Sequence, residues 1–444
     1  MNTANPVWSN WSGAVTARPS AIWRPRDEAE LAALIRAHKG GPIRPAGSGH
    51  SFTPLCASDG VIVSLDHMAG LISASPETGE AELWAGTPVY MVGPLLHAHG
   101  LALANQGDVD RQTIAGAIGT GTHGTGIDLG SLSTMVCGVT LVTGAGDILT
   151  VDAKNDPELF EAARLSIGSL GVVTRFRLKL KAAYALNEAS WAADAEDTLN
   201  RLDDYAARHR HFEFFWFPHA DRVVAKSLDI AEGVRPERAL DIAGMKARGE
   251  RVSAEEKAFQ QICRMVRWFP GSSSWFHRFL TRQMAAGEAK PGRVRWSWET
   301  FPSARTTRFN EMEYAVPRES AAAATRALVA RIRAERIPTA FPIEFRFVKA
   351  DDIWISPFHG RESVTLSVHQ DPKMDQWRLF GAAEEICRSF GGRPHWGKQH
   401  RLKAADFAAI YPKWADFQAA RRRADPEGKF LSPYLKELFE TGIA

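Results

Sequence analysis

The sequence predicts an α+β protein of roughly two domains, and three observations lead to this prediction. With 444 residues, the chain is too long for one ordinary hydrophobic core. Residues 41 to about 180 contain short apolar runs punctuated by Gly, Pro and Asp, which indicates short strands. From about residue 181 onward, longer helical patterns alternate with strand patterns. The change in pattern near residue 180 therefore predicts a domain boundary there.

The first predicted elements, within residues 22–40, are a short strand and an amphipathic helix. Asp27, Glu28 and Glu30 fall in the first turn of this helix, where negative charge suits the positive end of the helix dipole. Residues 166–171 form a Gly-rich turn into a buried strand at 172–176. The order of these elements is strand, helix, short strands, and then the second domain.

The second domain opens with strands such as 211–217 and continues into residues 236–290, which are rich in Arg, Lys, Glu and Ala. This composition predicts helices with exposed faces. Four tryptophans lie in or near this region: Trp268, Trp275, Trp296 and Trp298. They could stack on a sugar ring, but we favour a role in a core or an oligomer interface.

Charge and composition indicate a small-molecule partner. The net charge of +3, with 45% hydrophobic and 24% charged residues, is typical of a globular protein that binds neither nucleic acid nor a polybasic membrane site. We find no signal peptide and no run of about 18 apolar residues, so we expect a cytoplasmic protein with no membrane partner. The four cysteines are too widely spaced for a metal or redox motif, and we expect them to be reduced and buried: Cys56, Cys137, Cys263 and Cys387.

The run Arg44–Phe52 reads RPAGSGHSF and is the most informative segment of the chain. Gly47, Ser48 and Gly49 have side chains small enough for successive backbone N–H groups to approach an anion closely. His50 follows directly, within reach of whatever a bound pyrophosphate carries. The alternative is a glycine-rich surface turn with a solvated histidine.

A second glycine-rich run covers residues 113–126 and contains Gly119–Gly124, which matches G-x-G-x-x-G. A Rossmann interpretation fails, because turn formers and then a strand-like segment at 136–142 follow instead of an amphipathic helix. We interpret the run as a segment between strands whose N–H and hydroxyl groups donate to a cofactor. Just upstream, residues 105–108 read NQGD.

Two strands in the second domain each carry a polar face. In residues 341–348 the period of two places Ile343, Phe345 and Phe347 on one face and Glu344 with Arg346 on the other. In residues 363–369 the outward side chains are Thr365, Ser367 and His369. These faces predict a polar wall over a cavity, although a solvated sheet with a surface ion pair would give the same pattern.

The last motif is Arg393–Lys398, RPHWGK. Pro394 and Gly397 make it a turn, so His395 and His400 cannot share a helix face as metal ligands, and we expect no metal. Taken alone, Lys398 would be a solvated charge.

Together these four runs resemble FAD-linked oxidases of the vanillyl-alcohol oxidase type, and most closely the sugar-1,4-lactone oxidases and bacterial alditol oxidases. The resemblance covers nearly the whole chain and is weakest between about 230 and 300. It implies a PCMH-like FAD-binding domain at 1–178 and a substrate (cap) domain at 179–405 on an antiparallel sheet with helices. A C-terminal segment, 406–444, would return to the FAD-binding domain.

The resemblance also implies roles for individual residues. It suggests a covalent bond between His50 and the flavin, oxygen access past Gly107, and an aspartate, Asp108, where several relatives carry serine. The implied catalytic residues are Glu344, Arg346, Lys398 and His369. The implied FAD-binding residues are Ala46, Gly47, Ser48, Gly49, His50, Ser51, Gly107, Asp108, Thr113, Gly116, Thr120, Gly121, Thr122, His123, Val173, His395 and Lys398.

The resemblance implies that the protein oxidises a CH–OH group by hydride transfer to flavin N5, with O₂ as acceptor and H₂O₂ as product. The expected substrate is an aldono-1,4-lactone such as L-gulono-, L-galactono- or D-arabinono-1,4-lactone. The alternatives are an alditol oxidase acting on xylitol or sorbitol, and a lactone dehydrogenase with a non-oxygen acceptor. An inert flavin-binding protein is disfavoured, because His50, Glu344, Arg346 and Lys398 are all present.

Overall fold

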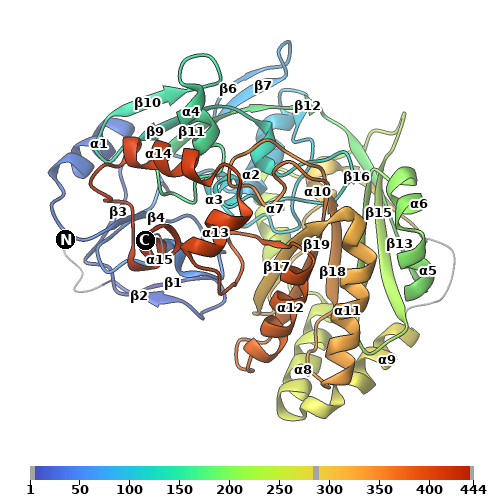
Figure 1. Cartoon of the computed structure of the whole chain (residues 1–444). Helices are drawn as coiled ribbons and strands as arrows, with labels where there is room; N and C mark the ends of the chain where they lie inside the picture. The colour runs from blue at the N-terminus through green and yellow to red at the C-terminus, as the bar shows by residue number, and fades with distance from the viewer. Residues whose placement is uncertain (1–5, 284–289, 441–444) are drawn as a thin grey trace.

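A computed structural model describes residues 6–283 and 290–440. Figure 1 shows two parts lying side by side, one built from the first 180 residues and one dominated by a large sheet. The C-terminal helices, in red, lie against the first part.

The N-terminal part contains a parallel and an antiparallel sheet. The parallel sheet has the order β3-β5-β4 and the antiparallel sheet the order β10-β9-β11-β7-β6. Their strands are β3 (Ala21–Trp23), β4 (Ile43–Pro45), β5 (Val61–Val63), β6 (Leu71–Ser75), β7 (Glu80–Trp84), β9 (Val136–Val142), β10 (Ile148–Val151) and β11 (Val172–Lys179). Two-residue strands pair as β1 (Trp8–Ser9) with β2 (Thr16–Ala17) and as β8 (Leu101–Ala102) with β12 (Lys181–Ala182).

Helices of this part follow their sequence signals. The predicted first helix is α1 (Glu28–Ala37), where the side chain of Asp27 accepts from the Glu30 N–H at 2.8 Å and Leu31 and Ile35 are buried. The others are α2 (Val89–His97), α3 (Ile114–Gly119) and α4 (Pro157–Ala163). The run 113–126 is therefore not a plain connection between strands, because Thr113 caps a short helix by accepting from Gly116 N–H at 3.2 Å.

The second part is built on one antiparallel sheet with the order β16-β13-β15-β14-β18-β19-β17-β20. Its strands are β13 (Ala185–Asp194), β14 (His211–Trp216), β15 (Arg222–Ile230), β16 (Lys290–Trp296), β17 (Asn310–Pro317), β18 (Ile343–Val348), β19 (Ser363–Gln370) and β20 (Arg393–Pro394). Both predicted polar-faced strands exist, and they are neighbours with Glu344 opposite Ser367.

The apolar face of this sheet packs against two helices. The cap helices are α5 (Ala195–Asn200), α6 (Leu202–Arg208), α7 (Ile242–Glu250), α8 (Ala254–Trp268), α9 (Ser273–Gln283), α10 (Ser297–Thr300), α11 (Ala321–Ala334) and α12 (Trp377–Ser389). Phe345 shares one buried core with Leu328 of α11 and Phe380 of α12. Figure 1 shows both helices in front of β17, β18 and β19. The opposite, polar face is thereby left to line the interior between the two parts.

The C-terminal helices α13 (Ala404–Ile410), α14 (Trp414–Ala424) and α15 (Pro433–Phe439) pack against the N-terminal part. Backbone hydrogen bonds join Ile43 N to Lys429 O at 2.8 Å and Gly144 N to Ala424 O at 3.0 Å. The five-stranded sheet of the N-terminal part ends at Lys179, and the large sheet of the second part begins at Ala185. The residues that hydrogen-bond back to the N-terminal part, Ala424 and Lys429, lie beyond residue 405. Both features support the division at 178 and 405, which stays a prediction.

The expectation that all four cysteines are buried needs correction: all four are free, but Cys56 and Cys137 are only half-buried. Trp296 and Trp298 are buried and stacked at 5.6 Å, as a role in a core predicts. Trp268 and Trp275 are exposed, so of the two favoured roles a core position is excluded for them and an oligomer interface stays a prediction. Among the described residues, no helix is long and apolar enough to cross a membrane.

Candidate active site

Two adjacent cavities lie at the junction of the two parts. The first, about 960 Å³ including its open mouth, is lined by residues from both parts, and the second, about 820 Å³, lies within the N-terminal part. Ser51 and Thr120 line both.

The second cavity is a cradle of backbone that fits a phosphate-containing group. Gly47, Gly116 and Gly119 line it, together with Ala46, Thr113 and Val173. A Cβ built on Gly119 meets no other atom within 4 Å, so a side chain there would project into free space. At Gly47 a Cβ would lie 2.1 Å from Thr113 Oγ1, so the loop needs glycine to approach α3 closely. The cradle therefore fits the pyrophosphate of FAD.

Arg44 holds this cradle in place. Its guanidinium is buried and donates to the carbonyls of Leu55, Gly168, Ile167 and Phe430 at 2.6–2.7 Å. Burial lowers the pKa of Arg44 to about 10, which still leaves it charged at neutral pH. The Arg44 side chain thus connects the loop that follows β4 to the turn before β11 and to the C-terminal segment.

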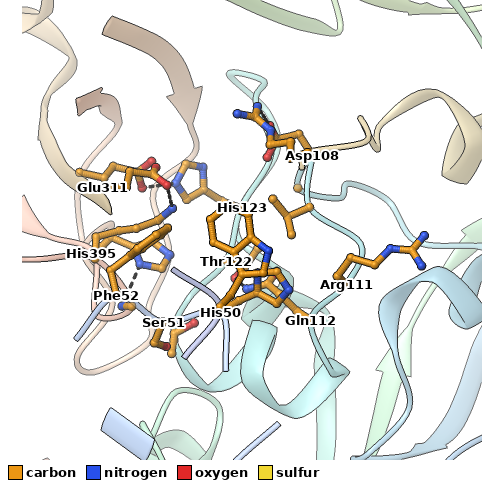
Figure 2. Close-up of a pocket in the computed structure, with 18 of the residues that line it drawn as sticks. His50, Ser51, Phe52, Asp108, Arg111, Gln112, Thr122, His123, Glu311 and His395 are labelled. Atoms are coloured by element: carbon orange, nitrogen blue, oxygen red, sulfur yellow. Dashed lines mark hydrogen bonds and ion pairs between the residues drawn. The ribbon is translucent and has the colours of Figure 1, made fainter. Parts of the chain in front are cut away.

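His50 stands at the boundary of the first cavity, stacked on Trp11 with ring centroids 5.5 Å apart. Burial, and then the nearby charges of Lys398, Arg308 and Arg111, lower the pKa of His50 to about 4. Its imidazole is therefore neutral at physiological pH and available as a nucleophile. Gln112 and Thr122 line the same cavity, and Gln112 donates to Thr122 Oγ1 at 3.2 Å (Figure 2).

Gly107 and Asp108 line the first cavity on the N-terminal side. A Cβ at Gly107 would lie 3.1 Å from Thr122 Cγ2 and 3.2 Å from the His123 carbonyl, so glycine lets the two loops pack closely. The carboxylate of Asp108 pairs with Arg305. Burial would raise the pKa of Asp108, but Arg305 and Arg346 together lower it, so this aspartate is ionised.

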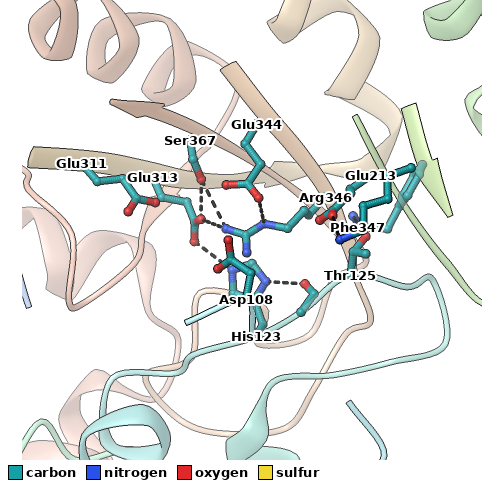
Figure 3. Close-up of polar contacts among 12 residues, drawn as sticks. Asp108, His123, Thr125, Glu213, Glu311, Glu313, Glu344, Arg346, Phe347 and Ser367 are labelled. Atoms are coloured by element: carbon teal, nitrogen blue, oxygen red, sulfur yellow. Dashed lines mark hydrogen bonds and ion pairs between the residues drawn. The ribbon is translucent and has the colours of Figure 1, made fainter. Parts of the chain in front are cut away.

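The opposite wall of the first cavity is the polar face of the large sheet. Glu344 and Arg346 project from β18 and His369 from β19, and all three are buried rather than solvated. Figure 3 shows the Arg346 guanidinium between Glu344 on one side and Glu313 with Ser367 on the other. The surface ion pair considered as an alternative is thereby excluded.

Glu313, on β17, joins the two walls. One oxygen, Oε1, lies 2.8 Å from His123 Nε2, and the other accepts from Arg346 and from Ser367 Oγ, each at 2.5 Å. Burial would raise the pKa of Glu313, but His123 and Arg346 hold it well below its ordinary value. The loop 119–124 and the polar face of the large sheet are thus connected through one carboxylate.

Glu311, two residues earlier on the same strand, holds Lys398. The ammonium of Lys398 pairs with Glu311 Oε2, and His369 Nε2 lies 3.5 Å from Oε1. Burial opposes ionisation of Glu311, but Lys398 and His369 lower its pKa below the ordinary range. His395 accepts from Gly397 N–H through Nδ1 at 3.0 Å, and burial lowers its pKa to about 3, so it is neutral.

Glu344 differs from the other carboxylates. Burial raises its pKa to about 7, with Arg346 opposing the shift and Asp108 and Glu213 adding to it. Arg346 Nε lies 3.7 Å from its Oε1, which is too far for a hydrogen bond. A buried carboxyl that titrates near neutrality, beside a fixed arginine, is suited to exchange a proton with a substrate.

Glu311, Glu344 and His369 offer three ligand atoms within 4.8 Å of one another. Lys398 already pairs with Glu311 and Arg346 faces Glu344, so two cations occupy the neighbourhood that a metal would need. We therefore retain the prediction that no metal is bound.

The structure brings together most of the predicted site residues. His50, Gly107, Asp108, Thr122, His123, Glu344, Arg346, His369, His395 and Lys398 all line the first cavity. Ser48, Gly49 and Gly121 line neither cavity; Ser48 is exposed, and Gly49 O accepts from Trp11 N–H at 2.7 Å.

Sequence reasoning missed Glu311, Glu313, Arg305 and Trp11. The two glutamates alternate with Met312 and Tyr314, the same period of two that identified Glu344 and Arg346, so strand periodicity would have found them. Arg305 and Trp11 come from loops with no such signal.

The comparisons agree with this geometry. The sequence matches an FAD-binding domain family over residues 19–152 and the family described as D-arabinono-1,4-lactone oxidase over residues 176–438. It is 36% identical to an L-gulono-1,4-lactone dehydrogenase of Mycobacterium tuberculosis, over 98% of this chain and 99% of that protein. It is 29% identical to the L-gulonolactone oxidase of Bos taurus, over 97% and 98%, and 29% identical to an alditol oxidase of a Streptomyces species, over 97% and 99%.

The fold is similar to that of a cholesterol oxidase from B. sterolicum, with a TM-score of 0.80, 19% identity, and coverage of 98% of this chain and 97% of that chain. This likeness confirms the predicted fold class, a two-part α+β flavoprotein of the vanillyl-alcohol oxidase type. The chain belongs to the D-arabinono-1,4-lactone oxidase family of FAD-dependent oxidoreductases, which act on CH–OH groups.

Proposed function

We propose that this protein oxidises an aldono-1,4-lactone, such as L-gulono-, L-galactono- or D-arabinono-1,4-lactone, with FAD attached covalently to His50. The observation that carries the proposal is one cavity lined by the buried Glu344 and Arg346, by the half-buried Lys398 and by His50. The 36% identity to a lactone dehydrogenase over nearly the full chain supports the substrate class.

Bound flavin supplies the acceptor for the hydride that leaves the substrate carbon. The chain's own residues must then manage the hydroxyl proton and the charge that develops on oxygen. Glu344, with a pKa of about 7, accepts the proton, and Arg346 and Lys398 provide fixed positive charge beside the oxygen. His369 and neutral His395 offer hydrogen bonds to the remaining hydroxyl groups of the substrate.

A direct test compares substrates. Purified FAD-loaded protein would be assayed with aldono-1,4-lactones and with xylitol and sorbitol, following both H₂O₂ release and reduction of an artificial dye. Turnover of lactones only supports the proposal, and turnover of polyols only would replace it with an alditol oxidase, which the similarity to the Streptomyces enzyme makes the second candidate.

Attachment through His50 is tested by acid precipitation. Flavin colour that stays with the pellet, and that leaves it in His50→Ala, supports a covalent bond. Colour released from the wild-type pellet contradicts the bond while leaving lactone oxidation standing.

The proposal also names the electron acceptor that reoxidises the flavin. Gly107 lines the cavity without a side chain, which supports O₂ as acceptor and H₂O₂ as product. The relative with 36% identity is described as a dehydrogenase, so a non-oxygen acceptor is the specific alternative. Dye reduction without H₂O₂ release would establish that alternative.

A further inference from the structure

The end of the cap formed by α8 and α9 exposes an unusual set of aromatic side chains. Trp268 is 75% exposed, Phe269 63%, Trp275 56% and Phe279 43%, and Met265 is also exposed. Trp275 and Phe279 stack with ring centroids 5.2 Å apart. Figure 1 shows the two helices at the lower end of the second part. We call this set the aromatic patch.

Helix α9 is amphipathic in the reverse sense to an ordinary surface helix. Its buried positions are Ser273, His277 and Thr281, which follow one another at a spacing of four residues. Phe276 is half-buried against the core that contains Val266, while Trp275 and Phe279 are exposed. A helix that packs on a protein core normally buries its aromatics and exposes its polar side chains. Contact with the rest of the cap therefore does not account for the outward aromatic face, which needs a separate apolar environment.

Helix α8 reaches the same patch from the other side. Cys263 and Val266 are buried against Phe52 and Phe309, which line the first cavity, and Trp268 lies at the outer end of the helix. One helix thus has an inner face that forms part of the cavity wall and an end that carries the patch.

The charged side chains within residues 257–287 are all basic. No Asp or Glu occurs between Glu256 and Glu288, whereas this stretch contains Lys257, Arg264, Arg267, Arg278 and Arg282. Arg264, Arg278 and Arg282 are exposed, and Arg267 pairs with Asp371. Aromatic side chains interleaved with arginines are typical of helices that lie in a membrane interface.

The same charges argue against pairing of two copies. In a two-fold interface each patch faces itself, so Arg264, Arg278 and Arg282 of one copy would oppose the same arginines of the other with no carboxylate from this stretch between them. A surface of anionic lipid offers phosphates to these arginines and an apolar layer to the aromatics.

We propose that the aromatic patch docks this protein onto the surface of a membrane containing anionic lipids. Trp268, Phe269, Trp275 and Phe279 insert into the interface, and Arg264, Arg278 and Arg282 contact lipid phosphates. The docking is peripheral and involves no membrane-spanning helix. This proposal revises the expectation that the protein has no membrane partner. The net charge of the whole chain, +3, does not show that the charged residues within 257–287 are all basic.

The test is co-sedimentation of the FAD-loaded protein with vesicles of phosphatidylcholine and phosphatidylglycerol in equal parts, and with vesicles of phosphatidylcholine alone. We expect binding to the mixed vesicles that is at least about tenfold stronger than to phosphatidylcholine. The variant Trp268→Ser with Trp275→Ser and Phe279→Ser should lose binding to both. The variant Arg264→Gln with Arg278→Gln and Arg282→Gln should lose only the preference for anionic lipid.

A matched control replaces exposed apolar residues elsewhere on the cap, Ile230→Ser with Val234→Ser, and should bind vesicles like the wild type. Circular dichroism and flavin content verify folding of each variant. Absence of wild-type binding to mixed vesicles overturns the proposal. So does a concentration-dependent dimer in analytical ultracentrifugation that the aromatic variant abolishes while vesicle binding is unchanged.

Discussion

The Nε2 atom of His123 lies 2.8 Å from Oε1 of Glu313, and its Nδ1 lies 2.8 Å from the carbonyl oxygen of Gly124. The second oxygen of Glu313 accepts from Arg346 and from Ser367. One buried carboxylate therefore joins the loop that carries His123 to the guanidinium on the opposite wall of the same cavity.

Replacement of Glu313 by Gln removes the charge that pairs with the buried Arg346. We expect the free energy of unfolding to fall by about 3–5 kcal/mol, as when one partner of a buried ion pair is removed. Denaturant unfolding measures this change. The exposed Glu385→Gln serves as control, and a Glu313→Gln variant as stable as the wild type would contradict this role of the carboxylate.

Glu344 predicts a pH dependence with a definite sign. Its pKa is about 7, so the ionised base forms as pH rises, and kcat/KM should increase through about pH 7. Glu344→Gln should remove this limb and lower kcat by roughly 10²–10⁴-fold. A rate profile across pH 5–9 checks both, and an unchanged limb in the variant would assign the titration to another group.

The same group makes an opposite prediction for stability. Because the pKa of Glu344 is raised by burial, the unfolded chain releases this proton at lower pH than the native protein does. Its contribution to stability is therefore full below the unfolded pKa and is lost as pH rises to about 7. At pH 8 the Glu344→Gln variant should have a free energy of unfolding a few kcal/mol higher than that of the wild type, whereas at pH 4 the two proteins should differ little. Urea unfolding at the two pH values measures the difference.

Variants of the Lys398–Glu311 ion pair distinguish a catalytic role of Lys398 from a role in stability. Lys398→Met leaves Glu311 buried without its ammonium partner, so we expect about 3–5 kcal/mol of destabilisation and a loss of roughly 10²–10³ in kcat. The double variant Lys398→Met with Glu311→Gln should recover most of the stability and none of the activity. Lys403→Met, at an exposed pair with Glu437, should change stability by less than about 1 kcal/mol. Recovered activity in the double variant would show that Lys398 acts only on Glu311.

Gly107→Ala tests access of oxygen to the cavity. The added methyl group would meet Thr122 and the His123 carbonyl at about 3 Å and narrow the gap between the two loops. We expect H₂O₂ production to fall by about tenfold while dye reduction changes little. The control is Gly271→Ala, where a Cβ meets nothing within 4 Å. An equal fall in both activities would mean that the methyl disturbs the substrate instead.

The sequence by itself determined the local elements of the site. The period of two in β18 and β19 placed Glu344, Arg346 and His369 on one face, and the small residues around Gly47 determined a loop that an anion can approach. These features depend only on neighbouring residues. The four motifs in their order also indicated the family, to which the chain belongs.

Only the tertiary structure decided which charges meet. Glu313 contacts His123, 190 positions away, and Arg305 contacts Asp108 across 197 positions, which no local pattern can reveal. The pKa of Glu344 depends on burial that arises when the two parts close over the sheet face. Helix α9 shows the same limit, because Trp275 was expected in a core or an oligomer interface, whereas Ser273, His277 and Thr281 are the buried positions and leave Trp275 exposed. Burial and long-range electrostatics are properties of the assembled fold, and the chemistry of this site depends on both.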